Sequence, residues 1–199
     1  MKDFDAAIGK LQDALEAESL DNKVNIVIFS DHGMTDISPS RSIDISDILG
    51  SSSVKMYTDC GHMCNIWPHQ DKLEEVYDAL TNLGNKHITV YKKEEIPDKW
   101  GYKNHRLVPP ILIVVDNGWF ILTPENPVVK CARWHGYVPE EEDMRGIFLT
   151  RGPGIKQNNR VGPCRAVDVY QVMCKLLDIV PLQHRGDWNR VKKHIRMID

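Results

Sequence analysis

The spacing of apolar residues predicts an amphipathic helix at the start of the chain and a buried strand directly after it. One helical face carries apolar side chains at intervals of three or four positions, namely Phe4, Ile8, Leu11 and Leu15. Asp21 and Asn22 end this pattern, and residues 24–29 are then almost continuously apolar and largely β-branched. Such a run is typical of a strand with both faces covered. We therefore expect it inside a central sheet rather than at the edge.

Strands and helices alternate along the rest of the chain. Short apolar runs predict further strands at residues 65–67, 87–91, 111–115, 119–122 and 146–149. Helical spacing predicts one helix from Leu73 to about Gly84 and another over residues 166–177, with Pro181 just beyond it. The Ser- and Asp-rich residues 35–61 predict a looser stretch. This alternation predicts an α/β fold with a largely parallel central sheet flanked by helices.

Length, composition and net charge limit the classes of protein to which this chain can belong. The 199 residues, with 42% hydrophobic and 27% charged side chains, suffice for one soluble domain with a core, and no repeat or low-complexity linker suggests a second. The formal net charge of -3 and the lack of a basic stripe argue against a nucleic acid polymer as partner. No apolar run approaches the roughly 20 residues that span a bilayer, and the first residues lack the apolar region of a signal peptide.

The five cysteines give a weak signal. Cys60 and Cys64 flank His62 at a spacing that faintly resembles a metal knuckle, but no second pair follows at finger spacing. Two ordinary thiols or a local disulfide are the simpler interpretations. Because the count is odd, at least one cysteine stays unpaired or pairs with another chain.

Asp31 and His32 are the strongest local candidates for chemistry. They follow the predicted strand of residues 24–29, and ligands of open α/β sheets bind beyond the carboxyl ends of strands. Gly33 allows a sharp turn that points both side chains to one ion, and a carboxylate with a neutral imidazole suits Zn²⁺. The alternative is that Asp31 caps the next segment and His32 is polar surface.

His135 is a second candidate, since it lies beside Gly136 and before a predicted strand. A histidine between aromatic residues is more often packed than ligating, so its immediate neighbours favour the simpler interpretation. The remaining histidines have no comparable context and are interpreted as surface or core residues: His62, His69, His87, His105, His184 and His194.

Several segments in a fixed order resemble one family. Residues 24–37, with Ser30-Asp31-His32-Gly33-Met34 at their centre, resemble the ectonucleotide pyrophosphatase/phosphodiesterases of the alkaline phosphatase superfamily. The likeness continues through residues 89–97, 116–119, 135–137, 143–149, 152–153 and 167–170, which span nearly the whole chain. Residues 30–37, 134–137 and 143–149 are most similar to the choline-specific glycerophosphodiester branch of the family.

The resemblance implies a two-zinc enzyme in which a threonine attacks phosphorus and water then hydrolyses the phospho-threonine. By resemblance, Asp31 and His32 bind the zinc nearest the nucleophile, and His135 binds the other. Two cations at about 4 Å lower the pKa of a nucleophile and offset charge on the phosphoryl oxygens. The implied substrate is a small phosphodiester such as glycerophosphocholine, with a nucleotide as the alternative. The family also implies an extracellular or cell-surface location and allows a homodimer.

The chain also departs from the family pattern. The family's threonine nucleophile and its Asp-x-x-x-His ligand pair are expected upstream of the first helix, and Val138 stands where relatives usually have Asp. Residues 1–199 are therefore interpreted as the C-terminal part of a single phosphodiesterase domain, with an incomplete alkaline-phosphatase-like fold. We expect these residues by themselves to be inactive; a non-catalytic truncated product is the alternative to an enzyme. We also expect Asp31, His32 and His135 to converge in space.

Overall fold

The computed structural model describes residues 2–160, 162–193 and 195, which form two compact units. Residues 32–146 make up the central unit, and residues 1–31 with 147–199 make up the terminal unit. Each unit contains strands and helices, as the predicted α/β class requires. No described helix combines the length and the apolar character needed to cross a membrane.

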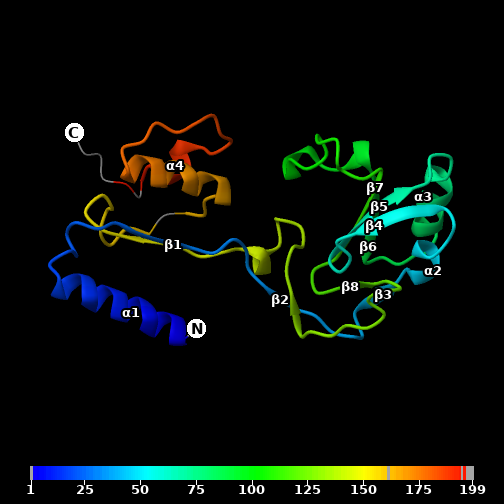
Figure 1. Ribbon diagram of the computed structural model, residues 1–199, viewed down its shortest axis with the longest axis horizontal. Coiled ribbons are helices and arrows are strands. Elements are labelled where there is room, and N and C mark those ends of the chain that lie inside the picture. Colours follow the sequence, from blue (N-terminus) through cyan, green and yellow to red (C-terminus); the bar gives the residue numbers. More distant parts are fainter. Residues whose placement is uncertain (1, 161, 194, 196–199) are drawn as a thin grey trace. The chain divides into compact units, whose positions relative to one another are not determined.

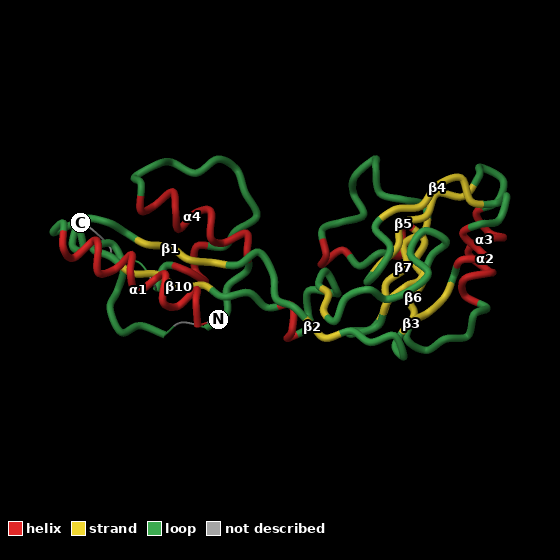
Figure 2. Tube along the Cα trace, turned by 60° about the horizontal axis from the view of Figure 1, so that its bottom comes forward, coloured by secondary structure: helices red, strands yellow, loops and turns green. Residues whose placement is uncertain are grey.

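A four-stranded sheet organises the central unit (Figure 2). Its strands are β4 (Val54–Thr58), β5 (Met63–Pro68), β6 (Ile88–Lys92) and β7 (Ile111–Val115), in the spatial order β4-β5-β7-β6. Every pairing in it is antiparallel. The prediction of a largely parallel central sheet is therefore not confirmed for the described residues.

The apolar run of β7 misled the prediction because both faces of this antiparallel sheet are covered. Ile111, Ile113 and Val115 pack into the main core. Helices α2 (Ser46–Leu49) and α3 (Leu73–Thr81) cover that side (Figures 1 and 2). The alternate residues Leu112 and Val114 face a second apolar cluster. That cluster includes residues near the short helices η1 (Lys93–Glu95) and η2 (Asp98–Trp100). A strand covered twice is continuously apolar whatever the direction of its neighbours.

Two smaller strand pairs complete the central unit. Strand β2 (Thr35–Asp36) pairs antiparallel with β9 (Arg133–Trp134), and β3 (Ser42–Asp44) pairs parallel with β8 (Phe120–Leu122). The short helix η3 (Glu142–Met144) follows β9. The predicted loose stretch of residues 35–61 is wrong, since it holds β2, β3, α2 and β4. Its Asp residues are exposed, its Ser residues range from exposed to buried, and a few buried isoleucines anchor it to the core.

The terminal unit is built around one antiparallel strand pair. It comprises α1 (Lys2–Ala17), β1 (Ile26–Phe29), β10 (Phe148–Arg151), α4 (Ala166–Leu176) and α5 (Trp188–Val191). Helices α1 and α4 lie on opposite sides of the pair (Figures 1 and 2). A small core between β10, α4 and α5 includes Ile155, Val172 and Val191.

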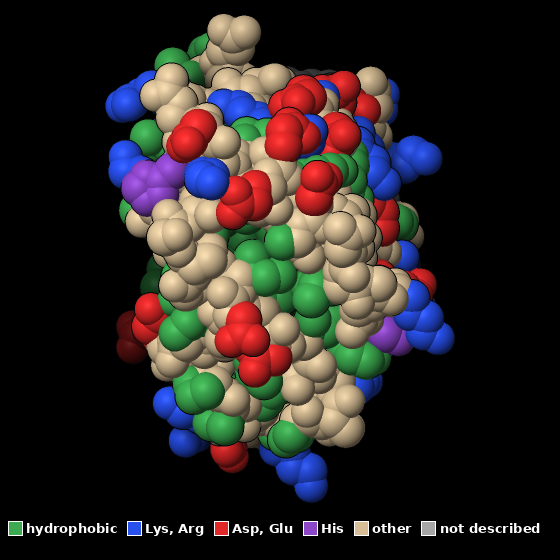
Figure 3. Space-filling view, turned by 90° about the vertical axis from the view of Figure 1, so that its right-hand side faces the viewer, with side chains coloured by type: hydrophobic (Ala, Val, Ile, Leu, Met, Phe, Trp, Pro, Cys, Tyr) green, Lys and Arg blue, Asp and Glu red, His purple; other side chains and the backbone are tan. Residues whose placement is uncertain are grey.

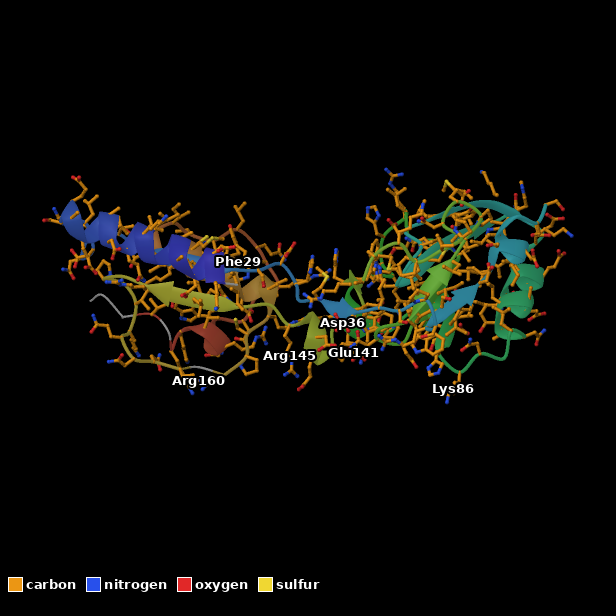
Figure 4. The ribbon with its side chains drawn as sticks, turned by 90° about the horizontal axis from the view of Figure 1, so that it is seen from below. Phe29, Asp36, Lys86, Glu141, Arg145 and Arg160 are labelled. Atoms are coloured by element: carbon orange, nitrogen blue, oxygen red, sulfur yellow. A yellow bond between two sulfur atoms is a disulfide. The ribbon has the colours of Figure 1, made fainter. Side chains whose placement is uncertain are left out.

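The expectation that residues 24–29 lie inside a sheet is wrong for the described residues. Strand β1 forms a two-stranded sheet with β10, so each is an edge strand. Phe29, labelled in Figure 4, is 50% exposed, and Leu149 on β10 is 54% exposed. The helix predicted at the start of the chain is confirmed as α1, which ends at Ala17, before Asp21, but α1 has no buried residue. An apolar sequence requires cover, but it does not specify which residues provide it.

Surface charge agrees with the composition. Figure 3 views the α2 and α3 end of the central unit, where exposed apolar side chains lie between groups of acidic and basic residues. Neither sign of charge dominates this face, which agrees with the formal net charge of -3. The view supplies no basic surface of the kind that follows a nucleic acid backbone.

Candidate functional site

His32 and His135 lie face to face in the central unit although they are far apart in the sequence. Their ring centroids are 3.8 Å apart and the ring planes differ by 12°. His32 precedes β2, and His135 directly follows β9. Because β2 pairs with β9, the strand register brings the two histidines together.

A hydrogen bond to the backbone identifies Nδ1 of His32 as a donor. Its Nδ1 lies 2.7 Å from the carbonyl oxygen of Gly33, which only accepts hydrogen bonds. Nδ1–H is therefore the donor, and Nε2 is the nitrogen that carries the lone pair whenever the ring is neutral. Histidines that ligate metals commonly donate their other N–H to a carbonyl or carboxylate in this way.

The backbone beside His32 packs tightly against the segment around η3. The Gly33 amide donates to the Met144 carbonyl at 2.9 Å. A Cβ atom at position 33 would lie 1.9 Å from the Asp143 carbonyl oxygen, so only glycine allows this approach. Figure 4 marks Asp36 on β2 and, at the ends of this segment, Glu141 and Arg145.

The Asp143 carboxylate connects three segments of the central unit. Its Oδ2 accepts hydrogen bonds from Thr35 Oγ1 at 2.8 Å and from Asn117 Nδ2 at 2.9 Å. These two donors lower the pKa of Asp143. Asp143 and Asn117 both fall in segments that carry the family resemblance, yet the sequence assigned them no role. The hydrogen bond between Asp143 and Thr35 fixes the start of β2, three residues beyond His32.

Trp134 forms the third member of a ring stack. Its ring lies 6.1 Å from that of His135 with an interplanar angle of 15°. Phe120 contacts the indole edge to face, with centroids 5.3 Å apart. The indole Nε1–H donates to Nδ1 of His62 at 3.1 Å. The three rings are therefore linked in the order His32, His135, Trp134. His62 holds the Trp134 indole through its hydrogen bond.

His62 is a functional candidate that the sequence interpretation missed, since it was treated as an ordinary histidine. Burial, together with the nearby His135, lowers the pKa of His62 to about 4, although Asp59 acts in the opposite direction. The ring is therefore neutral at pH 7. Its position between Cys60 and Cys64 was the only signal in the sequence, and the structure pairs these cysteines as a disulfide.

Asp31 falls in the other of the two compact units. It is an exposed residue at the end of the terminal unit, whereas His32 and His135 belong to the central unit. The expected convergence is therefore observed for His32 with His135. For Asp31 it stays a prediction.

The other histidines lack such an arrangement. His69 and His105 are exposed. His87 stacks on Trp119 at 3.9 Å and contacts the Asp116 carboxylate, and His184 contacts Tyr170 edge to face. His194 lies outside the described residues. Trp100, Tyr102, Trp119, Trp134 and Tyr137 pack against apolar clusters, as expected for core and loop aromatics.

The residues fit a metal in donor type but not in donor number. His32 presents a lone pair at Nε2, and His135 is exposed to an incoming ion. Structural and catalytic zinc sites use at least three protein ligands. Within the part of the chain that the structure describes, no group of three or more His, Cys, Asp or Glu side chains could hold an ion. The two histidines therefore form part of a site rather than a complete one.

The sequence of this chain is similar to those of known proteins. Residues 1–138 match the family described as type I phosphodiesterase/nucleotide pyrophosphatase. Human ectonucleotide pyrophosphatase/phosphodiesterase family member 5 is 36% identical over 190 residues, which are 95% of this chain and 39% of that protein. A bis(5'-adenosyl)-triphosphatase of Xenopus laevis is 33% identical over 192 residues, which are 96% of this chain and 41% of that protein.

The fold agrees with a solved relative. Murine ectonucleotide pyrophosphatase/phosphodiesterase 5 superposes with a TM-score of 0.89 at 35% identity, covering 98% of this chain and 51% of that chain. An inactive variant of the same murine protein was solved in complex with AMP, with the same TM-score of 0.89.

The chain spans about two fifths of the length of these curated relatives and 51% of the solved murine chain. The family match extends over residues 1–138 and therefore includes Asp31, His32 and His135. The chain belongs to the type I phosphodiesterase/nucleotide pyrophosphatase family, whose members are metal-dependent phosphoric diester hydrolases.

Proposed function

We propose that this chain supplies part of the metal centre of a phosphodiester hydrolase that acts on nucleotides. The observation that carries the proposal is the His32–His135 stack, in which two imidazoles from distant segments lie 3.8 Å apart. Paired metal ions in hydrolases lie about 3.5–4 Å apart. Two parallel rings at this spacing can each direct a nitrogen to a different ion of such a pair.

Each proposed ligand has a separate task. His32 offers Nε2 because Nδ1–H is engaged with the Gly33 carbonyl. His135 offers its ring to the second ion, and Asp31 adds a carboxylate beside His32. Imidazole and carboxylate donors suit Zn²⁺, which we propose as the metal. When bound, such ions offset the charge of a phosphodiester and activate the attacking oxygen.

The relatives favour a nucleotide substrate. One is named a bis(5'-adenosyl)-triphosphatase, and the murine structure holds AMP. The choline-specific likeness of residues 30–37, 134–137 and 143–149 makes glycerophosphocholine the second candidate. No relative described above carries that specificity in its name. A homodimer has no support in these observations and stays a prediction for size-exclusion chromatography.

An oxidising compartment fits the central unit. The structure pairs Cys60 with Cys64 as a disulfide, and disulfides persist mainly outside the cytosol. We therefore propose that the protein works outside the cell, as the prefix "ecto" in the names of its relatives suggests. Alkylation of the protein from its natural source, without reductant, should leave Cys60 and Cys64 unmodified. Alkylation of both would contradict this location.

The proposed function is tested in a chimaera of this chain with a complete relative. The matching segment of human family member 5 is replaced by residues 1–199, and metal-dependent hydrolysis of diadenosine polyphosphates, p-nitrophenyl thymidine monophosphate and glycerophosphocholine is measured. We expect nucleotide hydrolysis, reduced about 10³-fold or more by His32→Gln, by His135→Gln or by Asp31→Asn. His69→Gln, an exposed histidine of the same unit, is the matched control and should retain activity.

Two results would reject the proposal. Full activity in His32→Gln and His135→Gln would show that these histidines are not ligands. Preference for glycerophosphocholine over nucleotides would support the choline alternative. The 199-residue chain by itself, assayed with zinc, is expected to show no turnover, because the described residues supply fewer than three donors to any ion.

A further inference from the structure

His62 lies against both sequence neighbours of His135, namely Trp134 and Gly136. The loop around His62 is anchored first. The His62 carbonyl accepts from the Val115 amide on β7 at 3.1 Å, and the Gly61 carbonyl accepts from the Ile121 amide on β8. The Cys60–Cys64 disulfide closes the same loop. His62 therefore projects from a fixed part of the central unit.

His62 contacts the chain on both sides of His135. On one side its Nδ1 accepts from the Trp134 indole at 3.1 Å. On the other side, a Cβ atom added to Gly136 would lie 2.5 Å from Nε2 of His62, so the imidazole packs directly on this glycine. Gly136 has a φ of +94°, which disfavours any other residue there. The ring also meets Tyr137 edge to face, with centroids 5.9 Å apart.

A second glycine lets Trp134 reach this position. A Cβ atom at Gly61 would lie 3.2 Å from the indole Nε1 and 3.2 Å from Phe120. Gly61, Phe120 and His62 thus hold the indole from three directions. The indole lies nearly parallel to the ring of His135, with centroids 6.1 Å apart, and His135 in turn stacks on His32. A shift of the indole therefore changes the alignment of both proposed ligands.

We propose that His62 is a positioning residue for the metal centre, acting through Trp134 and Gly136 to set the orientation of His135. This inference rests on the proposed function for its catalytic meaning, but the geometry it describes does not require a metal. Groups that orient metal ligands typically change metal affinity by about 10–100-fold when they are lost.

The first test measures the metal-free 199-residue chain by NMR. His62→Ala should shift the ring signals of His135 and the indole N–H signal of Trp134. His62→Asn should restore both signals, because its side-chain oxygen can accept where Nδ1 accepts. His62→Gln should not, because its amide lies one carbon farther out. The comparison of His62→Asn with His62→Gln keeps the test valid even if His62→Ala fails to fold.

The matched control is His87→Ala. His87 also stacks on a tryptophan of the central unit, Trp119, with centroids 3.9 Å apart. Among the described residues, the ring of His135 stacks with His32 and Trp134 and not with Trp119. This variant should leave the His135 signals unchanged. Unchanged His135 signals in His62→Ala and His62→Gln, or equal changes in His87→Ala, would overturn the inference.

The second test uses the chimaera with human family member 5. His62→Ala should weaken zinc affinity, measured by competition with a chelator, by about 10–100-fold, and His62→Asn should recover most of it. The two proposals fail differently. If His135→Gln leaves zinc affinity and activity unchanged, the metal assignment is wrong, while the NMR comparison still decides whether His62 orients His135. If His62→Ala leaves zinc affinity unchanged although His135→Gln weakens it, the positioning role is wrong.

Discussion

Strand β7 in the central unit and strand β1 in the terminal unit have the same kind of sequence and opposite environments. Ile113 on β7 is fully buried in the main apolar cluster, whereas Phe29 on β1 is 50% exposed. Strand β7 has a neighbour on each side, and β1 pairs with β10 in a two-stranded sheet. The central unit thus provides the cover that its apolar strands require, and the described residues of the terminal unit do not.

The helices repeat this contrast. Helices α1 and α3 are both amphipathic by spacing, but α1 has no buried residue while α3 buries Val76 and Leu80. The terminal unit instead has a polar anchor. The fully buried Asp168 carboxylate binds the Arg190 guanidinium and accepts from the Asp187 amide. The central unit thus has the larger apolar core, and the terminal unit combines a smaller apolar core with an ion pair whose carboxylate is buried.

The largest effect is expected from a core truncation. Ile113→Ala should lower the free energy of unfolding by about 2–5 kcal/mol, because it removes buried methyl groups and leaves a cavity. Phe29→Ala should lower it by about 1 kcal/mol or less, although it deletes more atoms, because half of that ring already contacts water. Urea unfolding of both variants measures the difference. Equal losses would show that β1 is covered in solution.

The ion pair should give an intermediate effect. Asp168→Asn should lower the free energy of unfolding by about 2–3 kcal/mol, at the low end for a broken buried pair because Arg190 is 33% exposed and can be hydrated. Asp178→Asn is the matched control, since Asp178 is exposed at a φ of +54° that asparagine tolerates. It should change stability by about 0.5 kcal/mol or less.

The same pair predicts a pH dependence. Burial alone would raise the pKa of Asp168, but the Arg190 guanidinium and the amides of Asp187 and Arg165 outweigh it and lower the pKa below its usual 3.8. A carboxyl whose folded pKa is lowered stabilises the fold above its unfolded pKa, and this contribution is lost as the pH falls through the folded value. Stability of the wild-type chain relative to Asp168→Asn should therefore shrink below pH 3.8. A constant difference down to pH 2 would contradict this account.

The smallest effect is expected on the exposed face of α1. Leu11 is 48% exposed, so Leu11→Gln should change the free energy of unfolding by about 0.5 kcal/mol or less. Leu80→Gln on α3 places an amide in a fully buried site and should lower it by about 3 kcal/mol. Thermal unfolding of the pair separates the two helices. A large loss in Leu11→Gln would mean that another surface covers α1.

Local sequence determined the three longest helices and six of the ten described strands. The spacing of Phe4, Ile8, Leu11 and Leu15 sets α1. The apolar run at residues 111–115 sets β7. It could not set strand direction, because a strand covered on both faces is apolar in parallel and antiparallel sheets alike. It also could not find β2 and β9, which are two residues long and form only through each other.

The candidate site divides in the same way. The segments around Asp31, His32 and His135 identified these residues through resemblance, since glycine and histidine at a strand end are weak signals by themselves. The stack of His32 on His135 required the pairing of β2 with β9, which joins segments separated by most of the central unit. The contacts of His62 and Asp143 became visible only in the tertiary structure. Their partners Trp134 and Thr35 lie far away in sequence, and a hydrogen bond between distant side chains leaves no periodic trace in the chain.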